Sequence, residues 1–308
     1  MAHLISASRR TDLPAFYTPW LLGRLEAGFC EVSNPFNPHQ VRRVSLLPDD
    51  VLGFVFWTKN PRPLLPHLPD LTARGYPCAF QFTINPYDHV FEPAVLRTEA
   101  AVEAALALSD LLGPQRVVWR YDPIIESTLT PWSWHVAQFE ALCRRLSGQV
   151  REVVISFVNL YQRTRTRMDA LAVEHGFDYR FVSVKPEQSR LSAHGQSYAE
   201  DELRVRAAEL GALAARHGIR LGSCCGDELV DEAANVHKAH CISPGLFDVA
   251  RLPKGATREQ CGCCASIDIG AYDTCPHGCG RSYCYAVSNH DRALASRRAH
   301  DIGAARLG

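Results

Sequence analysis

Short apolar runs alternate with longer amphipathic stretches through residues 1–225 of the chain. This alternation is typical of βα units, in which parallel strands form a sheet and helices cover it. The apolar runs predict strands at His3–Ala7, Val51–Trp57, Cys78–Ile84, Arg116–Arg120, Val153–Phe157 and Ile219–Ser223. The amphipathic stretches predict helices at Pro19–Ala27, Arg97–Leu112, Trp132–Leu146, Arg163–His175 and Ala199–His217.

The length of the chain and the absence of internal repeats and linkers limit the folds that are possible. It has 308 residues, of which 46% are hydrophobic, so it can bury a large core. No repeat at a fixed period and no low-complexity linker divides it. We therefore predict an α/β fold with a TIM-like parallel βα barrel, either partial or full. Residues 1–223 are expected to form the barrel core, and residues 224–308 a cysteine-rich segment that completes it.

Polar residues follow five of the predicted strands. In a βα barrel the carboxyl ends of the strands form the active-site face, so five such tails would meet in one polar pocket. An Asp-Pro or Asn-Pro pair also simply ends a strand, and each tail alone allows that plainer interpretation. The tails are Ser6–Asp12, Trp57–Pro61, Gln81–Pro86, Trp119–Pro123 and Ser156–Leu160.

Charge and terminal sequence narrow the class of partner. The 33 Lys and Arg residues equal the 33 Asp and Glu residues, which gives no overall attraction to nucleic acid or to anionic membranes. A local basic groove is still compatible with this balance. The N-terminus has no basic region followed by an apolar one, and no apolar stretch reaches about 18 residues. We therefore expect a cytoplasmic protein without a membrane partner.

Cysteines are concentrated near the C-terminus. Nine of the twelve lie between Cys224 and Cys284. Because cytosolic thiols are kept reduced, a group of this density is more typical of metal ligands than of a disulfide scaffold. Cys30, Cys78 and Cys143 stand apart among apolar neighbours, where buried free thiols are the better interpretation.

The last three cysteines have the composition of an incomplete cluster site. Three residues separate Cys275 from Cys279, and four separate Cys279 from Cys284. Gly278 and Gly280 permit tight turns that bring three thiolates together. Three thiolates can bind three irons of a [4Fe-4S] cluster, which leaves the fourth iron open to another ligand.

The remaining cysteines of this region offer enough ligands for a second, closed site. We expect an auxiliary cluster on Cys225, Cys241, Cys261 and Cys263, with Cys224 as a substitute for Cys225. Spacing favours iron–sulfur, but tetrahedral zinc stays open, with His277 or His240 as a substitute ligand. Cys261-Gly-Cys263-Cys264 is too compact for all three thiols to bind one ion, so at least one of the paired cysteines, for example Cys264, is expected not to be a ligand.

The segment Tyr272-Asp-Thr-Cys275-Pro-His-Gly-Cys279 through Tyr283-Cys284-Tyr285-Ala286 resembles the cluster loop of radical S-adenosylmethionine (SAM) enzymes, in particular the spore photoproduct lyase-like branch. That loop reads Cys-x3-Cys-x2-Cys, and Tyr283 occupies its aromatic position before the third cysteine. This chain departs from it by two additional residues before Cys284. It also carries the loop near the C-terminus instead of after the first strand.

A circular permutation reconciles the position of the loop with that family. Residues 261–286 would supply the first strand and its loop, residues 289–305 the first helix, and His3–Ala7 the next strand. The whole chain also resembles a bacterial and archaeal family of unassigned function. The shared motifs are Ser6–Asp12, Asn34–Pro38, Phe56–Pro61, Trp119–Pro123, Ile155–Val158 and Ser266–Gly270.

The radical SAM resemblance implies an activity. Cys275, Cys279 and Cys284 would bind three irons, and SAM would chelate the fourth iron through its amino and carboxylate groups. An external one-electron reductant would then drive cleavage of SAM to a 5′-deoxyadenosyl radical, which abstracts hydrogen from a substrate. Photoproduct lyase similarity makes a nucleic-acid base lesion conceivable, yet the net charge does not support it, and a small metabolite, a peptide or a modified nucleotide fits equally well.

Under the same resemblance, the polar strand tails would position the cofactor. Basic side chains could meet the SAM carboxylate or a substrate phosphate, namely Lys59, Arg120 and Arg10. Acceptors could bind its amine or ribose hydroxyls, namely Asp12, Asp122, Ser156 and Asn159. Each of these residues could equally pair with a neighbour at a strand end. The alternative function is a non-catalytic zinc-binding or electron-transfer protein on an inert barrel.

Overall fold

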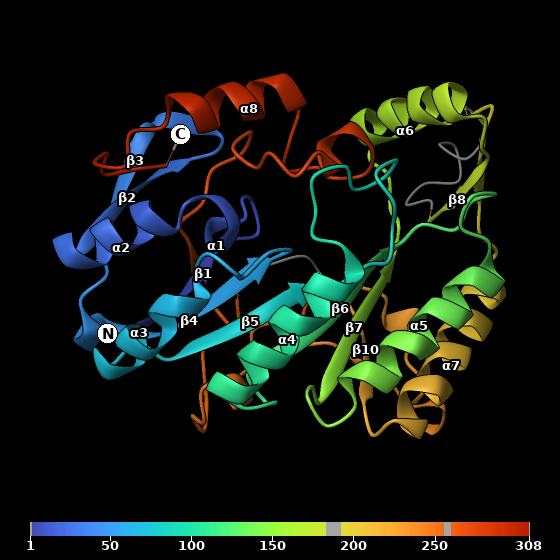
Figure 1. The fold of residues 1–308 in the computed structure, drawn as a ribbon, viewed down its shortest axis with the longest axis horizontal. Coiled ribbons are helices and arrows are strands. Elements are labelled where there is room, and N and C mark those ends of the chain that lie inside the picture. Colours follow the sequence, from blue (N-terminus) through green and yellow to red (C-terminus); the bar gives the residue numbers. More distant parts are fainter. Residues whose placement is uncertain (1, 183–191, 256–259, 308) are drawn as a thin grey trace.

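A computed structural model describes residues 2–182, 192–255 and 260–307. In this part of the chain, eight strands form one parallel sheet that helices flank (Figure 1). From one edge to the other, the strands are β11 (Val236–Lys238), β10 (Arg220–Ser223), β7 (Glu152–Phe157), β6 (Val117–Ile124), β5 (Cys78–Thr83), β4 (Val51–Thr58), β1 (His3–Ala7) and β12 (Ile267–Asp268). The predicted parallel α/β architecture is confirmed, and each of the six predicted strands is present.

The order of the strands has one discontinuity. From β1 to β11 each strand lies beside the next sheet strand in the sequence, but β12, the last strand of the chain, pairs with β1. Ile5 lies opposite Ile267, and the Ser6 hydroxyl donates to Asp268 at 3.0 Å. Among the described residues β11 and β12 are the two edges, so the sheet is open and the structure shows no closed barrel.

Helices and large aromatic side chains cover one face of the sheet. The helices of the described residues are α1 (Leu13–Phe16), α2 (Thr18–Ala27), α3 (Leu68–Ala73), α4 (Thr98–Leu112), α5 (Trp132–Leu146), α6 (Gln162–His175), α7 (Glu200–Arg216) and α8 (His290–Ala299). Side chains of α1 to α5 and of α7 belong to the core on this face, whereas those of α6 belong to a separate core. The five predicted helices match α2, α4, α5, α6 and α7 to within a residue or so at each end. Phe54, Phe80 and Trp119 point from the strands into this main core and are fully buried.

The opposite face of the sheet is covered by irregular chain. We call residues 239–255 and 260–264 the inner segment. Its side chains pack in a second core against Val55, Ala79 and Val118 of the strands. The packing is so close that a Cβ at Gly53 would lie 2.2 Å from the Phe247 ring. In Figure 1 the orange chain of this region passes behind the sheet, whereas α4 and α5 lie in front of it. Parallel sheets need cover on both faces, and here the cysteine-rich sequence supplies one of the two covers.

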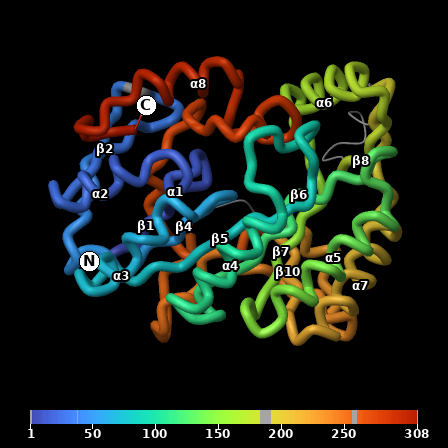
Figure 2. The backbone as a smooth tube through the Cα atoms, in the orientation of Figure 1, coloured from blue at the N-terminus to red at the C-terminus, as the bar shows by residue number. Residues whose placement is uncertain are grey.

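Two small pairs of strands were not predicted. An antiparallel hairpin joins β2 (Phe29–Asn34) to β3 (Asn37–Ser45), and β8 (Tyr179–Phe181) pairs with β9 (Gly195–Ser197). The C-terminal chain runs beside this hairpin (Figure 2), where the Glu31 N–H donates to the Ala305 carbonyl at 2.8 Å. None of the described helices is long and apolar enough to cross a membrane.

Candidate functional site

The polar strand tails meet at the carboxyl edge of the sheet, as their sequence positions predict. Asp12, after β1, accepts hydrogen bonds from the Thr58 hydroxyl and the Lys59 backbone, both at 2.7 Å. Asp122, near the end of β6, accepts from the Ser156 hydroxyl of β7. The Asp122 backbone N–H in turn donates to Asn85 at 3.0 Å. Neighbouring tails are thus joined side by side across the sheet.

Asp12 links this edge to the loop that carries the last three cysteines. Its Oδ2 atom lies 2.7 Å from His277 Nε2, and its backbone N–H donates to the Cys275 sulfur. Its Oδ1 atom also accepts the Ala15 N–H at 3.0 Å. Both carboxylate oxygens are therefore used within the protein. The sequence left open whether Asp12 would bind SAM or pair with a neighbour, and in this structure its carboxylate pairs with neighbours that include the cysteine loop.

Two of the three loop sulfurs accept hydrogen bonds from backbone N–H groups. Cys275 accepts from the backbone N–H groups of Asp12 and His277, and Cys284 from those of Ala286 and Val287. Cys279 is hydrogen-bonded to the Tyr283 hydroxyl, whose single proton is donated to Glu92. Cluster thiolates are stabilised by donors of this kind. The chemistry of the donor set therefore fits an iron–sulfur cluster.

The three loop thiols are protonated when no metal competes for them. Burial, then the Asp12 charge, raises the pKa of Cys275 to about 12. Burial, then the charge of Glu92, holds the pKa of Cys279 well above its ordinary value, and burial raises that of Cys284. A metal must therefore displace protons from this site as it binds. Cys279 is buried, whereas Cys275 and Cys284 are half-buried.

The two additional residues before Cys284 form a compact turn. A 3-10 turn at Cys279–Arg281 follows Gly278, whose φ of 86° requires glycine. The Cys284 N–H then donates to the Cys279 carbonyl at 3.0 Å and closes the loop. Arg167 on α6 donates to three loop carbonyls, those of Gly280, Cys284 and Val287. The longer spacing therefore keeps both cysteines close together.

Glu92 is the functional candidate that sequence reasoning missed. Its Oε1 atom accepts from Lys59 Nζ at 2.8 Å, from Asn85 at 3.0 Å and from the Tyr283 hydroxyl at 2.5 Å. Burial alone would lower the pKa of Lys59, but the charge of Glu92 and the hydrogen bond to it raise that pKa above its ordinary value. The Glu92 Oε2 atom is buried without a partner among the described residues. The signal in the sequence was weak, since a single Glu follows Phe91 in a loop.

A second polar centre surrounds Arg120 on the inner face of the sheet. Its guanidinium pairs with Asp122 at 2.5 Å and donates to Gln81 at 3.2 Å. It also donates to the Cys241 sulfur at 3.1 Å. Burial opposes its charge, but Asp122 and the sulfurs of Cys241 and Cys224 hold its pKa well above the ordinary value.

Five upstream cysteines form a chain of thiol hydrogen bonds that runs Cys225, Cys224, Cys241, Cys263 and Cys261. The sulfurs of Cys224 and Cys241 lie 3.8 Å apart. Hydrogen bonds among these thiols hold the pKa of Cys224 well below its ordinary value and that of Cys241 well above it, so Cys241 keeps its proton. The single Cys241 proton can stabilise one neighbouring thiolate, the form that binds metals.

The upstream cysteines lie near one another, but they are not arranged as the ligands of a single metal ion. No three His, Cys, Asp or Glu side chains of the described ranges converge as ligands of one metal ion. Thiolates on one tetrahedral zinc would all lie about 3.8 Å apart, given Zn–S bonds of about 2.3 Å. A [4Fe-4S] cluster takes one thiolate at each iron, so its cysteines need not meet at one point.

The sequence matches the model of a known protein family over most of its length. Residues 4–286 match the family described as a domain of unknown function, DUF1848. The chain belongs to this DUF1848 family. The matched region contains both groups of cysteines and ends before α8. No curated protein and no solved structure matches the chain.

Two predicted residues of this DUF1848 chain lie apart from the cysteine sites. Arg10 is 4.0 Å from Asp268 and stacks over the Tyr272 ring at 5.2 Å. It lines a cavity of about 180 Å³ between the β2–β3 hairpin and residues 269–272. Asn159 is exposed, and its backbone pairs with Val182. Among the described residues, neither side chain has a hydrogen bond or ion pair with a cysteine of either group.

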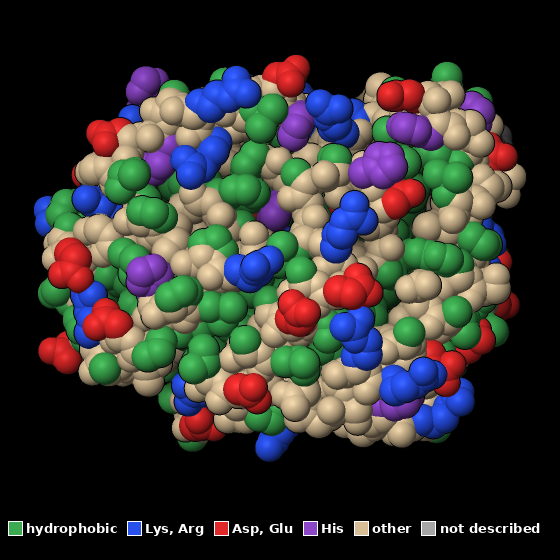
Figure 3. Space-filling model, in the orientation of Figure 1, with side chains coloured by type: hydrophobic (Ala, Val, Ile, Leu, Met, Phe, Trp, Pro, Cys, Tyr) green, Lys and Arg blue, Asp and Glu red, His purple; other side chains and the backbone are tan. Residues whose placement is uncertain are grey.

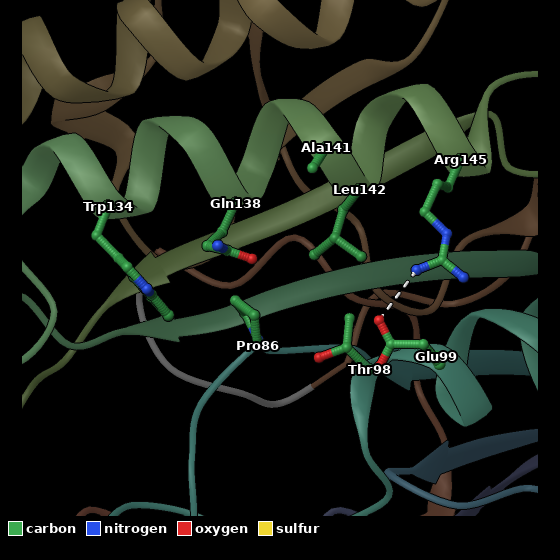
Figure 4. A pocket seen from close by; sticks show the side chains of 8 residues that line it. All are labelled: Pro86, Thr98, Glu99, Trp134, Gln138, Ala141, Leu142 and Arg145. Carbon is green, nitrogen blue, oxygen red and sulfur yellow. Dashed lines mark ion pairs between the residues drawn. The ribbon is translucent and has the colours of Figure 1, made fainter.

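The DUF1848 chain also has a groove of about 240 Å³ on its helical layer, between α4 and α5 (Figure 4). Trp134, Gln138 and Leu142 of α5 face Thr98 across it. An ion pair of 3.6 Å between Glu99 and Arg145 crosses one end. The residues that line this groove include none of the predicted site residues, so the candidate site is the carboxyl edge of the sheet.

Proposed function

We propose that this protein is a radical SAM-type iron–sulfur enzyme, with a [4Fe-4S] cluster on Cys275, Cys279 and Cys284. The observation that carries the proposal is that three neighbouring sulfurs, each hydrogen-bonded within the protein, lie at the carboxyl edge of a parallel sheet. Three thiolates leave one iron of such a cluster for a small-molecule ligand, here SAM. An external one-electron reductant is the other partner.

The strand order supports a permuted barrel. If β12 is counted as the first strand, the order along the sheet becomes the order of consecutive βα units, with β1 second and β11 last. The cysteine loop then follows the first strand, as in the radical SAM enzymes that it resembles. The permuted, TIM-like description of the open sheet is part of the same proposal.

The bound cluster would supply an electron that cleaves the sulfonium bond of SAM and leaves a 5′-deoxyadenosyl radical to abstract hydrogen. The chain's own residues would position the reactants. Lys59 and Tyr283 are fixed beside Cys279 by their bonds to Glu92. The unpartnered Oε2 of Glu92 would accept from an ammonium or hydroxyl group of the ligand, because a buried carboxylate oxygen without a donor is costly.

We leave the substrate unassigned. Lys and Arg side chains are interspersed with Asp and Glu over the face shown in Figure 3, in keeping with equal numbers of each in the sequence. A nucleic-acid backbone is bound chiefly through clustered positive charge, which gives no support here to such a substrate. A small metabolite, a peptide or a modified nucleotide is compatible with the site.

The test is SAM cleavage by anaerobically reconstituted protein with a strong reductant. We expect about seven to eight irons per chain and formation of 5′-deoxyadenosine, on the basis of two cubane clusters. Cys275→Ala should abolish cleavage and lose about four irons. Cys143→Ala removes a buried thiol on α5 outside both groups and should retain both properties. Absence of cleavage by the loaded wild-type protein contradicts the proposal.

One observation favours a second candidate function, a non-catalytic zinc protein. The 3.8 Å between the Cys224 and Cys241 sulfurs equals the edge of a tetrahedral zinc–thiolate site with Zn–S bonds of about 2.3 Å. Metal analysis of the protein as purified separates the two candidates. Zinc without iron or sulfide supports this second function and contradicts the first.

A further inference from the structure

The upstream cysteines lie on the inner face of the sheet rather than at its periphery. Side chains alternate between the two faces of a strand, and every second residue of the central strands points to the inner segment. A lower layer on this face is apolar, with Val55, Ala79, Val118 and Val154. The layer above it, toward the carboxyl edge, carries Trp57, Gln81, Arg120 and Ser156.

Arg120 connects this polar layer to the thiols. Its guanidinium touches the Cys241 sulfur at 3.1 Å and lies 5.2 Å from the centre of the Trp57 ring. Asp122 and Gln81 hold it from two other sides. The Trp57 Nε1 atom is a buried donor without a partner among the described residues. One fixed positive charge therefore faces the thiol group, and the ring that carries a spare N–H packs in the same core as the thiols.

A continuous chain of hydrogen bonds joins the two groups of cysteines. Starting at Cys241, it passes through Arg120 to Asp122, whose backbone donates to Asn85. From there Asn85 donates to Glu92, Tyr283 donates to the same Glu92 oxygen, and Tyr283 also bonds to Cys279. The upstream group is thus connected to the loop at Cys279. A metal site with a purely structural role would not need such a connection.

We propose that Cys224, Cys241 and Cys263, completed by Cys225 or Cys261, bind a second iron–sulfur cluster that is redox-active, and that Arg120 raises its reduction potential. The reaction is the gain of one electron from a low-potential one-electron donor, with no bond made or broken. The inference concerns iron at the upstream site and does not depend on SAM cleavage at Cys275, Cys279 and Cys284.

The physical reason is electrostatic. Reduction adds a negative charge to the cluster, and a nearby buried cation stabilises the reduced form more than the oxidised form. Hydrogen bonds to cluster sulfurs act in the same direction, and they are among the main determinants of the potential. Arg120 supplies both effects at Cys241, and its side chain is only 7% exposed, so water screens it little.

The experiment is a potentiometric titration followed by electron paramagnetic resonance. The full chain carrying Cys275→Ala provides the background, because only the upstream cluster should then remain, with about four irons. Arg120→Met should shift the ratio of reduced to oxidised cluster at least tenfold toward oxidised, which is about 59 mV for one electron. Arg120→Lys keeps the charge, loses the fork of donors and should give a smaller shift of the same sign.

Arg163→Met, at an exposed position of α6, is the matched control and should leave the potential unchanged. Circular dichroism and iron content show whether each variant is folded and loaded, and the lysine variant keeps the test decisive if the methionine variant does not fold. Zinc or no metal in the Cys275→Ala protein overturns the inference, as does an unchanged potential in the Arg120 variants. A shift without SAM cleavage by the wild type leaves this inference standing and contradicts only the proposed function.

Discussion

The Nε2 atom of His277 lies 2.7 Å from the Oδ2 atom of Asp12, although 265 positions separate them in the chain. Asp12 follows the first strand, and His277 stands between two of the loop cysteines. Their contact is one of several by which the start of the chain holds its C-terminal part. The cysteine loop is therefore a part of the sheet's carboxyl edge and not an appended tail.

Replacement of Asp12 tests whether this contact holds the loop. Asp12→Asn leaves one oxygen for four donors, so two buried donors lose their acceptor. We expect a loss of about 2 kcal/mol or more in the free energy of unfolding, together with lower iron content. Urea unfolding and iron analysis measure these effects. Asp110→Asn, at an exposed site of α4, should change stability by less than about 0.5 kcal/mol. Equal effects of the two substitutions would show that Asp12 does not hold the loop.

Gly278 is expected to be indispensable for the turn between the cysteines. Gly278→Ala combines a positive φ of 86° with a Cβ only 2.3 Å from Pro93. Gly218→Ala has a similar φ of 70° and open space around the new Cβ, so it isolates the backbone effect, about 1–2 kcal/mol. We expect the Gly278 variant to be the less stable of the two and to lose the iron of the first cluster. Full iron content in the Gly278 variant would contradict the described loop.

His135 should make the fold sensitive to mild acid. It is fully buried, with Nδ1 2.8 Å from the Tyr121 hydroxyl and Nε2 3.0 Å from the Ile125 carbonyl. Burial lowers its pKa from 6.5 to about 4. Because the unfolded chain binds the proton more tightly, stability is present above about pH 6.5 and is lost as the pH falls toward 4. Between pH 7.5 and pH 5 the loss from this group is about 2 kcal/mol.

Urea unfolding at these two pH values measures that loss. His135→Gln cannot take up a proton, so its stability should fall by about 2 kcal/mol less than that of the wild type over the same range. His39→Gln, at an exposed position of β3, should behave as the wild type does. The same pH dependence in wild type and His135→Gln would show that the buried histidine is not responsible.

The sequence predicts the long elements well because their patterns are local. Strand β1 and helix α5 begin and end at the residues predicted for them, since each presents an unbroken apolar run or a regular amphipathic face. The β2–β3 hairpin was missed because its residues are mostly half-buried or exposed, with prolines at its turn. Strands β11 and β12 have three and two residues, and only pairing with distant strands makes them strands.

The site residues likewise include some that local sequence predicts and some that only the folded chain brings together. Spacing along the chain predicts that Cys275, Cys279 and Cys284 lie together, and in the structure the Cys284 N–H donates to the Cys279 carbonyl. It does not predict Glu92 or Arg167, because a loop after β5 and the helix α6 reach the cysteines only in the folded chain. The strand tails were predicted to bind a cofactor, yet many of their polar atoms already bind one another. Contacts between distant tails decide that outcome, and no local pattern encodes them.

The central claim is an open iron site at Cys275, Cys279 and Cys284. It is tested most directly by the electron paramagnetic resonance spectrum of the reduced, iron-loaded protein with and without SAM. Only a cluster with an uncoordinated iron can bind SAM directly, so we expect the spectrum to change on its addition, and Cys275→Ala to abolish the change while the upstream signal persists. Identical spectra with and without SAM, in wild-type protein with both clusters loaded, would contradict the claim.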